Sequence, residues 1–111
     1  MSTRDDRIKE ILRDLGARFL LLNGNGSSLI TVTNVELTSR GKNATIFFTV
    51  FPAEFEKTAL EFAKRKRSEF KEFVMDQSKL GRVPQLDFEI DTGEKNRQKI
   101  DILLNEDNKV R

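Results

Sequence analysis

The chain has 111 residues, a net charge of +2, and no cysteine, histidine, tryptophan or tyrosine. That length suits one domain built around one hydrophobic core. Without cysteine and histidine there is no thiolate nucleophile, no imidazole base and no zinc site made from those ligands. The composition therefore argues against an enzyme, and we expect no metal or other cofactor and no small-molecule substrate.

The charge balance and the hydropathy pattern narrow the class further. The pI of about 9.0 suits a nucleic-acid partner without requiring one. No apolar run approaches the roughly 18 residues that a membrane helix needs, and the first residues carry no apolar signal segment. We expect a soluble cytoplasmic protein with no membrane contact.

The first segment, residues 3–22, carries apolar side chains at helical spacing with charges between them, which predicts an amphipathic helix. Gly16 lies within it, where a small residue allows close packing. Residues 23–28 are rich in Asn, Gly and Ser. They follow a helix and precede a strand, whereas phosphate-binding loops follow a strand and open a helix. We therefore interpret them as a connection.

Residues 29–37 and 44–51 are rich in β-branched and aromatic residues and predict two strands, joined by a hairpin at residues 38–43. The apolar phase shifts within the first strand, and a β-bulge near Asn34 reconciles it. Phe47 and Phe51 lie on the second face of the second strand. They could stack on bases, but we favour packing against the first helix or a loop.

Pro52 opens a second helical stretch, whose apolar phase is interrupted at Lys66. This predicts two helices, or one bent helix, with the joint near residues 63–67. Residues 78–83 are expected to form a turn, with Gly81 as the helix stop. Leu86, Phe88 and Ile90 then alternate with acidic residues, which predicts a third strand with one buried and one wet face. A last short helix is expected to include residues 100–104.

The predicted order is α-β-β-α-α-β, an α+β fold with a three-stranded sheet and its helices on one face. We expect one domain over residues 1–105 and a disordered tail over 106–111. Nothing in the sequence indicates an obligate oligomer, so we expect a monomer.

The densest charge run is the candidate binding site. Four successive cations can hold the phosphates of RNA through counterion release, or simply form a solvated helix face. Because the run interrupts the apolar phase, we favour function. Three further cations could extend the patch. The candidate RNA-binding residues are Lys64, Arg65, Lys66, Arg67, Lys71, Lys79 and Arg82.

The alternating carboxylates of the third strand, Asp87, Glu89 and Asp91, form a second cluster. Paired carboxylates can serve hydrolysis or bind metals. No other constellation supports catalysis here, so we interpret them as a solvated sheet face. They repel phosphate, and RNA is expected to avoid that face.

Three segments together carry a specific resemblance. The first is the strand pair, which reads ITVTNVELT at 30–38 and NATIFFTV at 43–50. The others read RVPQLDFEID at 82–91 and IDILL at 100–104. In this order they resemble the ribosome-binding factor A family. The resemblance implies a type II KH-like fold and a non-catalytic role, without cofactor, in late maturation of the small (30S) ribosomal subunit and its 16S rRNA. It also implies a role in cold adaptation.

The chain departs from the family at the helix joint. KH domains usually have a Gly-x-x-Gly loop there, and this family has an Ala-x-Gly kink. Residues 63–65 read Ala-Lys-Arg, so the glycine is absent.

Two alternatives to an assembly factor remain open. One is a free-standing KH-like domain that binds single-stranded RNA, against which the missing Gly-x-x-Gly argues. The other is a protein-interaction domain that uses an exposed sheet edge. A hydrolase that uses Asp87 or Glu89 ranks last.

Overall fold

The computed structural model describes residues 4–24, 26 and 28–93. Three expectations fall outside these residues: the last short helix, the disordered tail at 106–111 and the structural setting of the 100–104 motif. No helix within the described ranges is long and apolar enough to cross a membrane.

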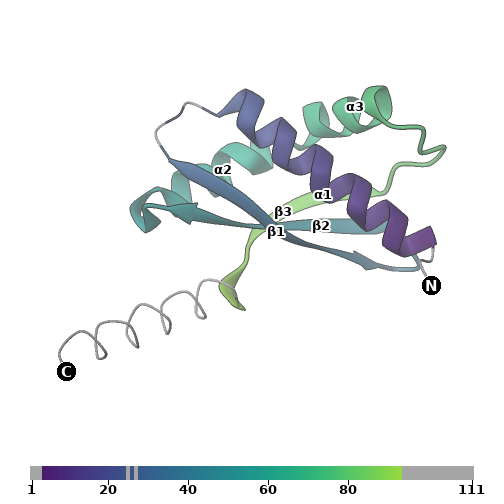
Figure 1. The fold of residues 1–111 in the computed structure, drawn as a ribbon, viewed down its shortest axis with the longest axis horizontal. Coiled ribbons are helices and arrows are strands. Elements are labelled where there is room, and N and C mark those ends of the chain that lie inside the picture. The colour runs from purple at the N-terminus through teal and green to yellow at the C-terminus, as the bar shows by residue number, and fades with distance from the viewer. Residues whose placement is uncertain (1–3, 25, 27, 94–111) are drawn as a thin grey trace.

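The elements follow the predicted order, with a short 3-10 turn ahead of the second helix (Figure 1). They are α1 (Arg4–Asn23), β1 (Leu29–Thr38), β2 (Asn43–Phe51), η1 (Ala53–Phe55), α2 (Glu56–Arg65), α3 (Arg67–Gln77) and β3 (Gln85–Ile90). The predicted joint between two helices is confirmed. It falls at Lys66, the single residue between α2 and α3.

The sheet has the strand order β1-β2-β3, with β1 antiparallel and β3 parallel to β2. The predicted bulge is confirmed: Val32 pairs with Phe48 while Asn34 pairs with Phe47, so Thr33 is the extra residue. This residue resets the side-chain alternation, so that Val32 and Val35 both point into the core. The hairpin turn is also confirmed, and Gly41 in it has a φ of 81°.

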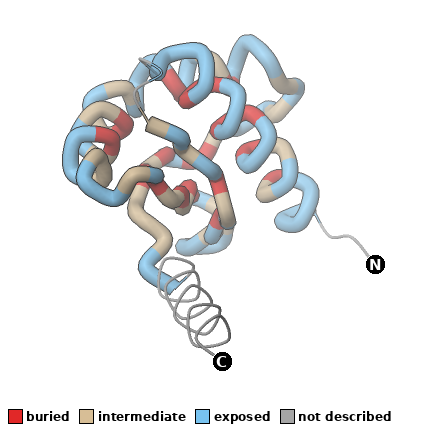
Figure 2. Tube along the Cα trace, turned by 60° about the vertical axis from the view of Figure 1, so that its left-hand side comes forward, coloured by how far each residue is buried: buried red, intermediate tan, exposed pale blue. Residues whose placement is uncertain are grey.

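The three helices cover one face of the sheet, as predicted, and the core lies between the two layers (Figure 1). Three phenylalanines connect the layers. The Phe70 ring centroid of α3 lies 5.1 Å from that of Phe19 in α1 and 5.1 Å from that of Phe88 in β3. Figure 2 shows the buried residues on the inward-facing side of the helices and the exposed residues outside. The described core contains no buried polar or charged residue.

Gly16 sets how closely α1 approaches the sheet. A Cβ atom at this position would lie 3.3 Å from Ile46 Cγ2 and 3.8 Å from Phe70 Cζ. The expectation that a small residue permits close packing is therefore confirmed.

The expectation that Phe51 packs against the first helix or a loop is wrong. Its exposed fraction is 73%, and it pairs across the strands with Leu29, which is 66% exposed. The reason is geometric, because α1 packs on the opposite face of the sheet, which carries Ile46 and Phe48. Phe47, on the same face as Phe51, is half-buried.

α3 ends where the sequence places the start of the turn, at residue 78, but Gly81 is not the residue that stops it. The helix ends at Gln77, four residues before Gly81. The Ser78 hydroxyl donates a 2.6 Å hydrogen bond to the Val74 carbonyl, and its backbone turns extended. A side-chain hydrogen bond of this kind competes with the helical pattern, so no glycine is needed.

Candidate functional site

The candidate site is built around the helix junction. Lys66 ends α2 and begins α3, with φ −94° and ψ 9°. Its amide donates to the carbonyls of Phe62 and Ala63, which tightens the last turn of α2. Since this φ is negative and open to any residue, the junction forms without the glycine that the family places nearby.

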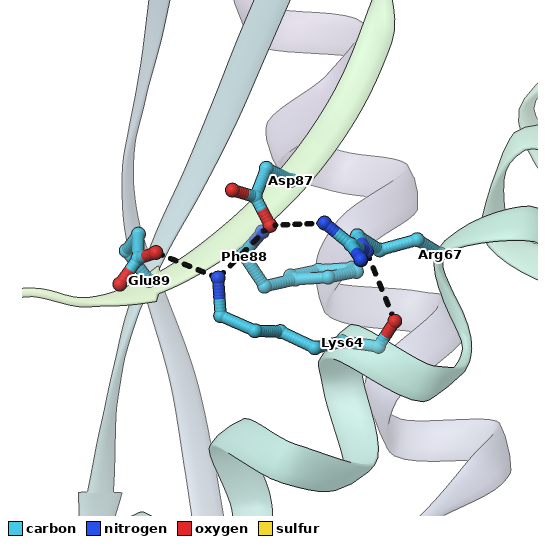
Figure 3. Close-up of polar contacts among 5 residues, drawn as sticks. All are labelled: Lys64, Arg67, Asp87, Phe88 and Glu89. Carbon is cyan, nitrogen blue, oxygen red and sulfur yellow. Dashed lines mark hydrogen bonds and ion pairs between the residues drawn. The ribbon is translucent and has the colours of Figure 1, made fainter.

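Lys64 and Arg67 point from the junction toward β3 (Figure 3). The Lys64 ammonium lies 2.7 Å from Glu89 Oε1 and 3.2 Å from Asp87 Oδ1. Arg67 Nη1 lies 3.3 Å from the same Asp87 oxygen, and Arg67 Nε donates to the Lys64 carbonyl at 3.0 Å. We call Lys64, Arg67, Asp87 and Glu89 the junction cluster. It contains two cations and two carboxylates.

The contacts within the junction cluster stabilise the charged forms of Lys64 and Asp87. The hydrogen bond to Glu89 raises the pKa of Lys64 above its ordinary value, and Asp87 adds to this effect against the cost of burial. Burial by itself raises the pKa of Asp87. Hydrogen bonds from the Phe88 amide and Lys64, together with the nearby positive charges, outweigh burial and leave that pKa below its ordinary value. Lys64 and Asp87 are therefore both ionised at neutral pH.

Lys66 is held on a different side of the junction. Its ammonium lies 3.3 Å from each Glu69 carboxylate oxygen and 5.9 Å from the centre of the Phe62 ring. The sequence suggested that this lysine takes the place of a core residue, and its side chain is indeed half-buried. The ring contact and the ion pair explain how a lysine is accommodated there.

Arg65 is the cation of the run without an ion pair among the described residues, and it is exposed. It lies at a groove of about 260 Å³ between α2, the end of α1 and the start of β1. Among the described residues no acidic side chain lines that groove, and its apolar lining includes Leu29, Phe55 and Phe62. Sequence reasoning missed this groove, because it forms between α2 and the segment from the end of α1 to the start of β1, which are distant along the chain.

The three supporting cations are all exposed, with no ion pair within the described ranges. Lys71 lies on α3, one turn after Arg67, and so extends the run along the helix. Lys79 and Arg82 follow the opposite end of α3. The structure thus places Lys71 beside the run and puts the other two in the connection that leads to β3.

The structure corrects the interpretation of the acidic residues as a separate solvated face. Asp87 and Glu89 were expected on a separate, solvated face that RNA avoids, but both are half-buried and paired with cations of the run. Asp91 accepts a hydrogen bond from the Thr33 hydroxyl. The cause is the position of β3 at the outside of the sheet, where the end of α2 packs beside it. The basic and acidic candidates form one surface.

Within the described ranges no group of three or more potential metal ligands comes together. The arrangement offers cations, hydrogen-bond acceptors and an apolar groove, which are means of binding. It contains no nucleophile paired with a base.

Comparison with known proteins assigns the family. The family model described as ribosome-binding factor A matches residues 4–104. The chain belongs to the ribosome-binding factor A family. The resemblance inferred from the strand-pair and 82–91 motifs is therefore confirmed.

Individual relatives agree with this assignment. Ribosome-binding factor A of Neisseria gonorrhoeae is 30% identical over 90 residues, which cover 79% of this chain and 73% of the relative. The protein of the same name from Neisseria meningitidis serogroup A is 31% identical over an equal span, with the same coverage.

Solved structures confirm the KH-like α+β fold. The crystal structure of ribosome-binding factor A from Thermus thermophilus superposes with a TM-score of 0.66 at 20% identity, covering 76% of this chain and 92% of that one. A Thermotoga maritima protein related to the same family gives a TM-score of 0.55 at 20% identity, covering 75% and 78%.

Proposed function

We propose that this protein is a non-catalytic assembly factor that binds the small (30S) ribosomal subunit and its 16S rRNA during late maturation. The observation that carries this proposal is the family match, which spans residues 4–104. The fold supports it, since the order of elements and the sheet agree with those of the family. The proposed role needs no cofactor and no small-molecule substrate.

The basic helix junction supports contact with ribosomal RNA. Arg65 and Lys71 are exposed and have no carboxylate partner in the described part of the chain, so a phosphate could bind them without breaking an ion pair. Lys66, next to Arg65 in the chain, is partly accessible. Phosphate contacts fix position rather than read sequence. Selectivity for the subunit would come from the shape of the RNA and from neighbouring residues.

The test is sedimentation of the purified protein with free small subunits, free large subunits and assembled ribosomes, each at low and high salt. We expect cosedimentation with the free small subunit that weakens steeply as salt rises. Equal binding to all three particles, or to none of them, would contradict the proposal. Analytical ultracentrifugation of the protein alone checks the accompanying expectation of a monomer.

Two other binding functions are outcomes of the same experiment. A free-standing binder of single-stranded RNA would bind short unstructured oligonucleotides as tightly as it binds the subunit. A protein-interaction domain would bind through an outer strand such as β1, and its affinity would change little with salt. A ribosomal role also fits a cytoplasmic location and a requirement for growth in the cold, which a deletion strain would test.

A further inference from the structure

The junction cluster keeps two cations of the basic run in ion pairs, so they are not free to bind an anion from solution. Of the four cations at 64–67, Lys64 and Arg67 are paired with Asp87 and Glu89 at distances of 2.7 to 3.3 Å. The cluster therefore has no net charge. A phosphate that approaches these two cations meets carboxylates already in place.

The Asp87 carboxylate is held by the backbone of β3. Asp87 Oδ1 accepts a 2.8 Å hydrogen bond from the Phe88 amide, and Phe88 is fully buried. Arg67 is fixed as well, because its Nε donates to the Lys64 carbonyl. Asp87 therefore cannot move away from the cations without breaking several contacts, whereas Glu89 is held by its contact with Lys64.

We infer that Asp87 and Glu89 are specificity-determining residues for RNA binding, because they hold Lys64 and Arg67 in ion pairs that an RNA must displace to use these cations. This inference rests on the proposed function and names how the same site selects its target. Generic RNA, which offers only phosphates, gains little from the exchange. A matched site on ribosomal RNA supplies further contacts that offset the loss of the ion pairs.

The energetic scale makes the exchange possible. The side chains of Asp87 and Glu89 are 37% and 44% exposed, and ion pairs of this kind contribute little net stability. They are therefore weak enough to be displaced by a good ligand. Their charges nevertheless repel every phosphate that comes near, and only an RNA that also donates hydrogen bonds to the released carboxylates, from base amino groups or 2′-hydroxyls, compensates for this repulsion.

The test uses the variant Asp87→Asn/Glu89→Gln, which keeps the size of both side chains and the acceptor for the Phe88 amide. The probe is a short labelled oligouridine, and binding is measured by fluorescence anisotropy across a salt series. We expect the affinity for oligouridine to rise about tenfold. Two additional phosphate contacts should steepen the slope of log K against log salt by about 1.4. The preference for the small subunit over oligouridine should fall.

Two further variants distinguish the release of Lys64 and Arg67 from a general effect of net charge on RNA affinity. Glu10→Gln/Glu36→Gln also removes two exposed carboxylates, on α1 and β1, and should leave oligouridine affinity nearly unchanged. Adding Lys64→Gln/Arg67→Gln to the first variant should cancel its gain. This comparison shows whether the gain depends on these two cations.

The inference and the proposed function can fail separately. If the variant folds, as judged by circular dichroism, and its oligouridine affinity and salt slope match those of the wild type, the carboxylates have only a structural role and the inference is wrong. An equal gain in the Glu10/Glu36 control would also overturn it. If the wild type fails to bind small subunits while the gain on oligouridine appears, the proposed function falls and the effect of the carboxylates on RNA affinity stands.

Discussion

Lys64 Nζ lies 2.7 Å from Glu89 Oε1, although the two residues are 25 positions apart in the chain. One is at the end of α2 and the other is on β3, so the contact joins the helix junction to the outer strand of the sheet. The same ammonium also contacts Asp87 at 3.2 Å. Lys64 therefore contributes to both the stability and the charge of this surface.

Replacing Lys64 with Met should lower the free energy of unfolding by about 0.5–1 kcal/mol, because it removes the ion pairs but keeps the aliphatic stem. The effect is small since the lysine side chain is partly exposed. Urea denaturation measures it. Lys71→Met removes an exposed lysine of α3 that has no ion pair among the described residues, and it should change stability less. Equal losses in both variants would show that the contacts to β3 contribute nothing.

The stability of the wild type should depend on pH through Asp87. Its pKa is lower in the folded protein than in the unfolded chain, so ionised Asp87 stabilises the fold. That contribution is present above the unfolded pKa of about 4 and is lost as pH falls through the lower folded value. We expect wild type and Asp87→Asn to differ by up to about 1 kcal/mol at pH 7, and this difference to shrink as pH falls below about 4.

The raised pKa of Lys64 predicts a loss of stability at high pH. Its pKa is raised on folding, so its contribution is complete below the unfolded pKa of about 10.4 and is lost as pH rises through the folded value. Urea denaturation at several pH values covers both ranges. A wild-type to Asp87→Asn difference that stays constant between pH 7 and pH 3 would contradict this assignment of the acid-side loss.

Much of the fold could be predicted from local pattern. The change of apolar phase between Val32 and Val35 predicted a bulge, and the alternation around Leu86 and Phe88 predicted which face of β3 is buried. These signals are local because backbone geometry forces side chains to alternate along a strand. The exposure of Phe51 could not be predicted in this way, since it depends on which face the helices cover.

The pairing within the site could not be predicted from spacing. The basic run and the acidic strand were both visible in the sequence, and each was interpreted by itself. Their contact depends on how the two helices cross from β2 to β3 and place the end of α2 beside β3. A basic run in the middle of the crossover, followed by acidic residues on the strand that the crossover leads to, is the signal that could have suggested it.

Gly16 should tolerate no large side chain. A Cβ there already lies 3.3 Å from Ile46 Cγ2, so the two γ-methyl groups of valine would force α1 away from the sheet. We expect Gly16→Val to lower the free energy of unfolding by about 1–3 kcal/mol. Denaturation in urea tests this. Ala17→Val, at the neighbouring exposed position of α1, is the control for placing a β-branched side chain in this helix. If both variants lose the same amount, close packing at Gly16 is not the cause.

Arg65 offers the cleanest test of RNA contact at the junction. Charge reversal at Lys64 or Arg67 would place a new carboxylate beside Asp87, so a loss of binding could reflect a disturbed fold. Arg65→Ala breaks no ion pair within the described ranges and should leave stability within about 0.5 kcal/mol of the wild type.

If Arg65 holds a phosphate, the alanine variant should bind small subunits several-fold more weakly. The slope of log K against log salt should become shallower by about 1. Sedimentation or anisotropy at several salt concentrations gives both quantities. Arg13→Ala removes an exposed arginine from α1, away from the junction, and should change neither. If the Arg65 variant binds as tightly as the wild type, Arg65 is not part of the interface. The remaining candidates are then Lys71, Lys79 and Arg82.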